Sequence, residues 1–466
     1  MSVIVYRIQA LLEQVLARVP VGTNLGLCHL LFALLSGRFL MARGAVFPAL
    51  TDLGLSEEAV RRAAAALCYG RWHTAALLAR WQHVVAQEGR FVPCAYEGVQ
   101  PVACDLTAFF RPQLRGLCSK HYVSEAGKAL PAVVFGLCAS VGQVGSGPSP
   151  TGQTRPTGQT RLGLPRLVLR RKSGECEADL QRRLVRQAAQ TLAPNEALVM
   201  DAGFGLADLL SVGGLRFVAR ARTNQTARRK EPPVYRGHGR RPTRGHLVRP
   251  LTRTRAGKAI AATPPDATES WRDGKRHLRA ELWNGLVLSD VKATETKATD
   301  AKAGTATFRL VAIYDPRYGQ PLLLASSLAV SAQALWRLYK DRWAIEQLPL
   351  SAKPMLGAER AFVSGQESRY RLPELALLAG SLLSYVAATG APVASGFWDR
   401  AARPTCGRVR RTLSRVHCAE LPVPAGQVRK KASVTAHLKT GVEAHRRHKA
   451  VHAPKDTAYA TRFTGN

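Results

Sequence analysis

The 466-residue sequence predicts an α/β protein, on the strength of two patterns. Apolar residues recur at helical spacing between residues 51 and 87, and helical patterns return between about 331 and 389. Between these stretches lie short apolar runs bounded by turn residues, such as VAC before Asp105, AVVFGLCASVG from Ala132 and EALVM before Asp201. Runs of this kind are typical of buried strands. The 46% apolar composition is sufficient for a buried core.

Composition divides the chain into five parts. They are a helical N-terminal region (1–95), a strand-rich part (96–221), a basic β-rich segment (222–305), a second strand-and-helix part (306–395) and a basic C-terminal arm (396–466). Ser56 is a candidate N-cap, and a break at Tyr69-Gly70 separates two helical stretches. That pair could be a DNA-binding helix-turn-helix, but an ordinary helical bundle has the same pattern. The tandem PTGQTR repeat predicts an exposed loop.

The charge balance is unusual for a globular protein. Sixty-seven Lys and Arg residues stand against 32 Asp and Glu residues, which gives a net charge of +35. Residues 211–280 hold 18 basic and four acidic residues, and the tail from Arg400 holds 15 and three. Such a balance argues against a typical cytosolic metabolic enzyme and favours a polyanionic partner. Nucleic acid is the preferred partner, ahead of an anionic membrane.

The remaining composition points to the cytoplasm. The nine cysteines form no C-x-x-C pair and lie mostly among apolar neighbours, so we expect reduced thiols. The N-terminus lacks a basic segment followed by a clean apolar run, so we expect no export signal. The two most apolar stretches, from Leu25 and from Leu375, are too short to cross a bilayer. We therefore expect no membrane partner.

The segment SAQALWRLYKDRWAIEQLPLSAKPMLG, from Ser331, has the most specific pattern. Tyr339, Arg342 and Glu346 stand at i, i+3 and i+7 and share one helix face, with Lys353 seven residues further on. Such a face suits an acidic metal ligand flanked by groups that hold phosphate. An Arg–Glu pair at i,i+4 is also common on ordinary surface helices. Pro349 and Pro354 predict that the helix ends before Lys353.

This order, Tyr-x2-Arg-x3-Glu-x6-Lys, resembles the signature of the DDE transposases encoded by bacterial insertion sequences. The resemblance implies an RNase H-like catalytic domain, interrupted by a β-rich insertion, with two further aspartates at strand ends. Asp105 in VACDLTAFFRP leads into a DxT pattern, and Asp201 in ALVMDAGFG opens a Gly-rich turn. The three acids lie 96 and 145 residues apart, and the wider gap holds the basic segment.

The resemblance also implies a chemistry. The residues implied to hold two Mg²⁺ or Mn²⁺ ions are Asp105, Asp201 and Glu346. Carboxylates suit these ions, and two ions about 3.5–4 Å apart clamp the attacking and leaving oxygens of a phosphodiester. The residues implied to contact DNA are Tyr339, Arg342 and Lys353. The substrate that the resemblance implies is double-stranded DNA, namely the terminal inverted repeats of a transposon and a target. A homodimer would bind this DNA in the nucleoid of the bacterial cytoplasm.

Two other functions fit the same residues. One is a different RNase H-like nuclease or resolvase that uses the same acids. The other is a non-catalytic nucleic-acid-binding protein derived from a transposase. The sequence contains no GxxxxGK[ST] loop, which argues against an ATP-driven helicase, and its 12 histidines show no H-E-x-x-H spacing.

Overall fold

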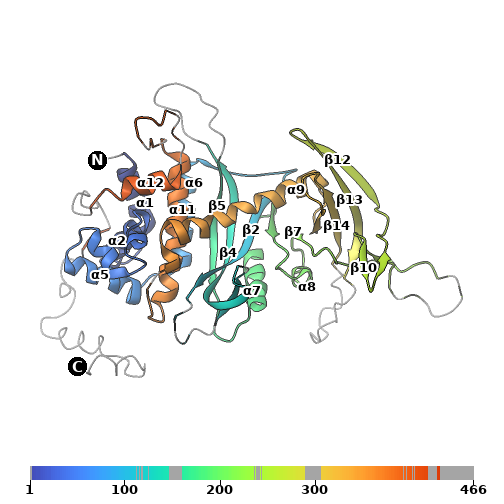
Figure 1. The fold of residues 1–466 in the computed structure, drawn as a ribbon, viewed down its shortest axis with the longest axis horizontal. Coiled ribbons are helices and arrows are strands. Elements are labelled where there is room, and N and C mark those ends of the chain that lie inside the picture. Colours follow the sequence, from blue (N-terminus) through green and yellow to red (C-terminus); the bar gives the residue numbers. More distant parts are fainter. Residues whose placement is uncertain are drawn as a thin grey trace.

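A computed structural model of the chain describes most of residues 3–430. The described residues are 3–111, 113–114, 116, 119–123, 125–145, 160–235, 237, 242, 244–288, 306–360, 362–391, 393–394, 396–400, 402, 405–417 and 428–430. Most of the tandem PTGQTR repeat and most of the C-terminal arm therefore lie outside the described residues. The last two residues of the repeat, Thr160 and Arg161, begin a strand rather than lying in the predicted loop. The molecule is elongated, with the N-terminal helices at one end and strands from the middle of the chain at the other (Figure 1).

Helices form the N-terminal region, as the sequence predicts. They are α1 (Val3–Leu16), α2 (Thr23–Leu35), α3 (Arg38–Met41), α4 (Val46–Asp52), α5 (Glu57–Tyr69) and α6 (Thr74–Glu88). The Ser56 side chain accepts a hydrogen bond from the backbone N–H of Ala59, so the predicted N-cap of α5 is confirmed. Most of these helices share one apolar core with α11 (Ser368–Thr389).

The two helices of the possible helix-turn-helix pack mainly against other elements. Helix α5 lies on α2 and α4, whereas α6 lies against α1, α11 and strand β5 (Thr160–Arg170). Trp81 of α6 is fully buried, and its indole N–H donates a hydrogen bond to the Ser381 hydroxyl of α11, 2.9 Å away. Helix α6 thus joins the N-terminal region to the sheet, and DNA contact by this region stays a prediction.

Among the described residues, thirteen strands form one mixed sheet. They are β1 (Phe91–Pro93), β2 (Gln100–Phe110), β3 (Lys120–Val123), β4 (Lys128–Val144), β5, β6 (Glu196–Met200), β7 (Phe217–Arg220), β8 (Ala227–Arg229), β9 (Leu247–Val248), β12 (Ala267–Asp273), β13 (Arg276–Val287), β14 (Phe308–Tyr314) and β15 (Leu322–Ser326). A separate pair joins β10 (Arg253–Arg255) to β11 (Lys258–Ile260).

The sheet combines antiparallel and parallel pairs. Its order is β1-β4-β2-β6-β7-β15-β14-β13-β8-β9, while β3 and β5 also pair with β4, and β12 pairs with β13. The pairs β2–β6 and β6–β7 are parallel, and the others are antiparallel. The basic segment 222–305 contributes β13, which pairs with β14. Strands β8, β9, β12 and β13 of this segment therefore extend the main sheet, while β10 and β11 do not.

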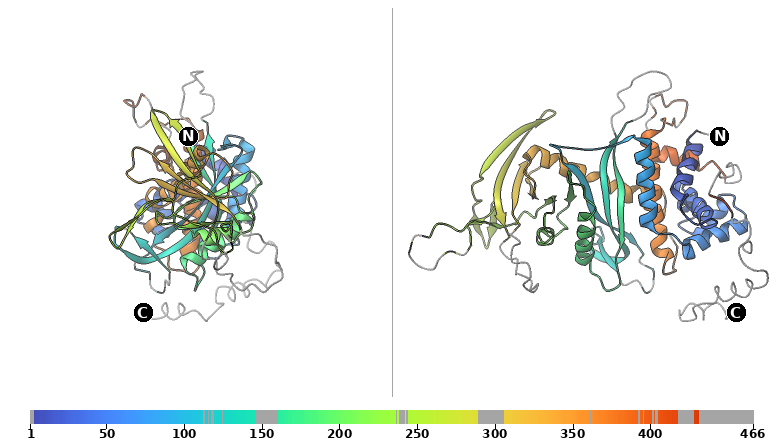
Figure 2. Two further views of the ribbon diagram at one scale, coloured as in Figure 1. Left: turned by 90° about the vertical axis from the view of Figure 1, so that its right-hand side faces the viewer. Right: turned by 180° about the vertical axis from the view of Figure 1, so that it is seen from behind.

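Helices cover both faces of the sheet around β6. Alternate residues of a strand point to opposite faces. Accordingly, Leu198 packs in the core that contains α7 (Glu177–Ala189), whereas Val199 packs in the core that contains α9 (Ala332–Asp341). The short helix α8 (Leu206–Leu210) follows β6. Two further views show α9 crossing the middle of the molecule (Figure 2).

The α-helix ends at Leu350, before Lys353, as the prolines predict, but the backbone stays helical past Lys353. Helix α10 (Trp343–Leu350) contains Pro349 and runs directly into a π-helical turn, Ser351–Met355, that contains Pro354. A π turn has i→i+5 hydrogen bonds, and single π turns are frequent at functional sites. The switch in hydrogen bonding thus follows Pro349 and includes Pro354. A 3-10 turn, Ala358–Arg360, follows.

Helix α11 is longer than the apolar run from Leu375 suggests. It has 22 residues with a mean hydropathy of 1.4 over its most apolar stretch, which is long and apolar enough to cross a membrane. However, 94% of that stretch is buried within the molecule. Helix α11 is thus a core helix, and the last described helix, α12 (Cys406–Leu413), packs against it. The described cysteines are free thiols, as expected.

Candidate active site

Two of the predicted acids come from neighbouring parallel strands. Strand β2 pairs with β6 from Gln100↔Glu196 to Ala103↔Val199. Continued by two residues, this register sets Asp105 beside Asp201, and neighbouring strands lie about 4.8 Å apart. Asp201 directly follows β6, as predicted.

Asp105, by contrast, lies in the middle of β2, so its expected position at a strand end is wrong. The strand continues because its antiparallel pairing with β4 extends to Phe110. Its parallel ladder with β6 nevertheless stops at Ala103. Asp105 therefore stands where β2 and β6 separate, which leaves space for its side chain next to Asp201.

The third acid reaches the same place from α10. Glu346 lies in the first turn of α10, and Arg342 forms the junction between α9 and α10. One guanidinium nitrogen of Arg342 lies 2.7 Å from Glu346 Oε1, and the other lies 3.6 Å from Asp105 Oδ2. The Arg342–Glu346 pair is therefore not an isolated surface salt bridge, because Arg342 also pairs with the Asp105 carboxylate of the sheet.

Two more groups hold Asp201. The Tyr339 hydroxyl donates a hydrogen bond to Asp201 Oδ1 over 3.2 Å, and a guanidinium nitrogen of Arg220 lies 4.0 Å from the same oxygen. The structure thus brings together Asp105, Asp201, Glu346, Tyr339 and Arg342, and we call these five residues the acidic cluster.

The electrostatics of the acidic cluster follow from burial and crowding. Burial raises the pKa of Asp105 to about 6, and the nearby charges of Glu346 and Asp201 act in the same direction. Burial alone would lower the pKa of Arg342, but its acidic neighbours raise it overall. The cluster therefore binds a cation favourably, and Arg342 supplies one.

Lys353 is not part of the acidic cluster. Its ammonium lies 5.3 Å from the centre of the Phe109 ring, and it lines a small cavity of about 200 Å³ with Thr107 and His121. Burial lowers the pKa of Lys353, while the charges of Glu359 and Asp105 oppose that shift. Lys353 therefore lies near the β2 strand that carries Asp105 but beyond the salt-bridge network.

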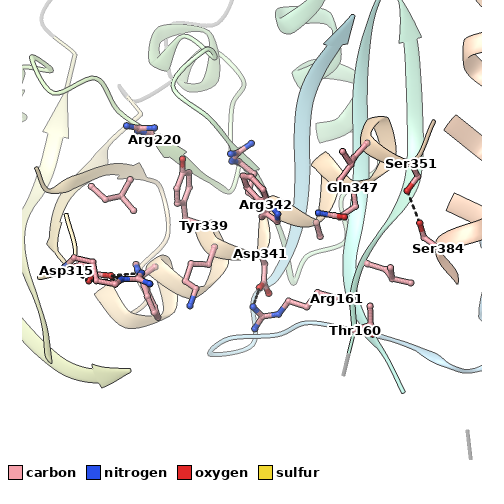
Figure 3. A pocket seen from close by; sticks show the side chains of 18 of the residues that line it. Thr160, Arg161, Arg220, Asp315, Tyr339, Asp341, Arg342, Gln347, Ser351 and Ser384 are labelled. Carbon is pink, nitrogen blue, oxygen red and sulfur yellow. Dashed lines mark hydrogen bonds and ion pairs between the residues drawn. The ribbon is translucent and has the colours of Figure 1, made fainter. Parts of the chain in front are cut away.

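A larger cavity of about 1300 Å³ opens beside α9 and α10. Arg220, Tyr339 and Arg342 line one side of it, and Asp341 with Arg161 lies opposite (Figure 3). Sequence reasoning did not single out Arg161 or Arg220. Arg220 could have been found, because it ends β7, and the carboxyl ends of parallel strands meet at one edge of a sheet. Arg161 ends the PTGQTR repeat, which the sequence predicts to be an exposed loop, and its partner Asp341 is distant in the chain.

Residues 64–278 match the family model of the DDE superfamily endonucleases. The match includes Asp105 and Asp201 and supports a DDE-type family for this chain. It ends before α9, so it does not extend to the Tyr-Arg-Glu-Lys segment. The search of curated proteins found no match. The mixed α/β fold and the convergent carboxylates agree with a metal-dependent endonuclease.

The donor chemistry of the acidic cluster fits a divalent metal. Endonucleases of this superfamily typically use divalent metals, and carboxylate oxygens are the ligands that Mg²⁺ and Mn²⁺ prefer. In the described part of the chain, no three His, Cys, Asp or Glu side chains are grouped as a metal site. Arg342 explains this spacing, because its guanidinium stands between Asp105 and Glu346.

Proposed function

We propose that the protein is a DNA transposase of the Tyr-Arg-Glu-Lys signature group, which cuts transposon ends and joins them to target DNA. The observation that carries this proposal is the convergence of Asp105, Asp201 and Glu346 on one site, where Arg342 pairs with Asp105 and Glu346 and Tyr339 bonds to Asp201. These three acids lie far apart in the sequence, yet β2, β6 and α10 bring them to one place. The antiparallel strands β5, β4 and β2, continued by the parallel strands β6 and β7, support an RNase H-like catalytic domain.

Each residue of the acidic cluster has a proposed role. Asp105, Asp201 and Glu346 bind Mg²⁺ or Mn²⁺, which supplies charge neutralisation and an activated water or 3′-hydroxyl at the scissile phosphate. Arg342 holds a DNA phosphate through its planar guanidinium, which suits two-pronged contact with phosphate oxygens. Tyr339 orients Asp201 through its hydroxyl.

Two further cations, Lys353 of the signature and Arg220 outside it, complete the proposed DNA contacts. Arg220 is half-exposed beside Asp201, and Lys353 lies close to β2. The substrate is double-stranded DNA, both the terminal inverted repeats and the target, bound by a homodimer. The net charge of +35 supports a polyanionic partner such as duplex DNA. The proposed location is the nucleoid in the bacterial cytoplasm.

Cleavage of a labelled duplex that carries a transposon end tests this proposal. Asp105→Ala, Asp201→Ala and Glu346→Ala should each reduce strand cleavage about a thousandfold or more, because the three acids act as one unit. DNA binding in a gel-shift assay should stay nearly unchanged, since removing an acid does not weaken attraction to phosphate. Strand transfer to a second duplex separates a transposase from a nuclease or resolvase.

Asp208→Ala is the matched control. Asp208 is also a partly exposed acid close to the second motif, but it faces Arg182, 3.8 Å away. Cleavage by this variant should equal that of the unmodified protein. Full cleavage by Glu346→Ala would refute the proposed site.

A further inference from the structure

Arg342 occupies an unusual position for a DNA-binding residue. It is 9% exposed, and its guanidinium faces the carboxylates of the acidic cluster rather than solvent. It pairs with Glu346 at 2.7 Å and with Asp105 at 3.6 Å, and the charge of Asp201 also acts on it. A single cation thus serves the three acids that the proposed function assigns to metal.

The acidic cluster needs such a cation when no metal is bound. Like charges close together in a half-buried site repel, and each loses hydration on burial. Arg220 cannot replace Arg342 in this role, because its side chain is 52% exposed and its nearest nitrogen is 4.0 Å from Asp201. Lys353 interacts with the Phe109 ring instead.

The same geometry makes Arg342 a competitor of the metal. A divalent ion held by Asp105 and Glu346 would have to approach the oxygens that the guanidinium now contacts. Two cations cannot share these oxygens without strong repulsion. Release of Arg342 would also free its guanidinium for a phosphate, the ligand whose geometry it matches best.

We propose that Arg342 is a resident counter-ion that pairs with Asp105 and Glu346 in the metal-free protein. When divalent ions bind, Arg342 leaves these carboxylates and binds a DNA phosphate instead. This proposal rests on the proposed role of the acids as metal ligands. It makes metal binding and DNA binding mutually reinforcing, because the phosphate removes the cation that competes with the metal. Metal should therefore bind more weakly to the free protein than to its DNA complex.

Titration of the full-length protein with Mn²⁺ in the absence of DNA tests this exchange, with free Mn²⁺ measured by electron paramagnetic resonance. Arg342→Gln should bind Mn²⁺ about tenfold more tightly than the unmodified protein, because a close charge pair couples at least that strongly. Arg342→Lys keeps the positive charge but loses the planar guanidinium, so its Mn²⁺ affinity should lie between those of Arg342→Gln and the unmodified protein. Arg337→Gln, an exposed arginine on the same helix, is the matched control and should leave the affinity unchanged.

Thermal unfolding gives a second measurement that a merely structural role would not affect. Without metal, Arg342→Gln should melt at a lower temperature than the unmodified protein, since its carboxylates repel. Saturating Mn²⁺ should raise its melting temperature by more than it raises that of the unmodified protein. A structural arginine would lower both melting temperatures equally and leave the Mn²⁺-induced shift unchanged.

The outcomes separate this proposal from the proposed function. If Glu346→Gln binds Mn²⁺ as well as the unmodified protein, the acids are not metal ligands and both proposals fail. If Glu346→Gln loses Mn²⁺ but Arg342→Gln gains no affinity, only the counter-ion proposal is overturned. Absence of Mn²⁺ binding in Arg342→Gln overturns it as well.

Discussion

Neighbouring acids of the α9–α10 segment differ in role because their surroundings differ. Glu346 is partly exposed and faces Arg342, whereas Asp341 has a fully buried side chain. Asp341 accepts a hydrogen bond from the Tyr96 hydroxyl at 2.7 Å and pairs with Arg161 at 3.0 Å. The helical spacing separates them, because Asp341 lies off the face that carries Tyr339, Arg342 and Glu346.

This difference predicts opposite effects of two alanine substitutions. Asp341→Ala should lower the free energy of unfolding by about 2 kcal/mol, because it leaves the part-buried Tyr96 hydroxyl without its acceptor. Cleavage per folded molecule, measured well below the melting temperature, should be retained. Glu346→Ala should show the reverse: near-normal stability in urea denaturation and no cleavage. An inactive but stable Asp341→Ala protein would place Asp341 in the active site.

Elements with a clear end signal were the easiest to predict from sequence. The start of α9 was read correctly at Ser331, whose hydroxyl accepts a hydrogen bond from the Ala334 N–H at 3.1 Å. The helical backbone beyond Leu350 was not, because the rules for proline do not include the π turn that follows Pro349 and contains Pro354. Such a turn depends on packing against α11, which no local pattern encodes.

The candidate site was predicted in part for the same reason. Tyr339, Arg342 and Glu346 lie on the consecutive helices α9 and α10 and at their junction, so their common face follows from helical spacing alone. The position of Asp105 within β2 depends on which strands pair on each side of it, and pairing joins residues distant in the chain. Arg161 belongs to β5 and meets α9 only in the folded protein. The sequence patterns thus do not reveal which residues distant in the chain come into contact.

At the scale of one helix, α2 contains a partly buried titratable group. Burial, assisted by the charge of Arg62, lowers the pKa of His29 to about 4. The pKa of a histidine in an unfolded chain is about 6.5. Below pH 6.5 the unfolded chain therefore binds a proton that the folded protein rejects. Stability should fall as the pH falls from 6.5 to 4, by at most about 1.4 kcal/mol per pH unit.

Urea denaturation of His29→Gln at several pH values measures this contribution. The variant should lose part of the acid sensitivity between pH 6.5 and 4. His83→Gln, at an exposed position of α6, should keep the full acid sensitivity. Equal pH profiles for both variants would show that His29 is accessible to protons in the folded protein.

At the scale of the whole molecule, the acidic cluster lies between two bodies that differ in chemistry. The helical N-terminal region and α11 form one end, and the basic strands of segment 222–305 form the other (Figure 1). Helices α9 and α10 connect them and carry Tyr339, Arg342 and Glu346 at the junction. A partner that contacts both ends must therefore pass close to the carboxylates. The positive charge is spread far beyond the acidic cluster. Substitutions that weaken DNA binding should therefore differ from those that abolish strand cleavage.

Salt titration of DNA binding tests this separation. Counterion release predicts that affinity falls steeply with salt, by about 10³–10⁵ between 50 and 200 mM for six to ten phosphate contacts. Arg220→Gln removes one proposed contact beside Asp201, so its log–log slope should be shallower by about 0.9. Arg182→Gln, on α7 on the other face of the sheet, should keep the original slope.

Glu346→Ala should also keep that slope while losing cleavage, because it changes the metal ligands and leaves the phosphate contacts in place. A flat salt response would contradict binding to nucleic acid, and an unchanged slope for Arg220→Gln would place the DNA away from the acidic cluster.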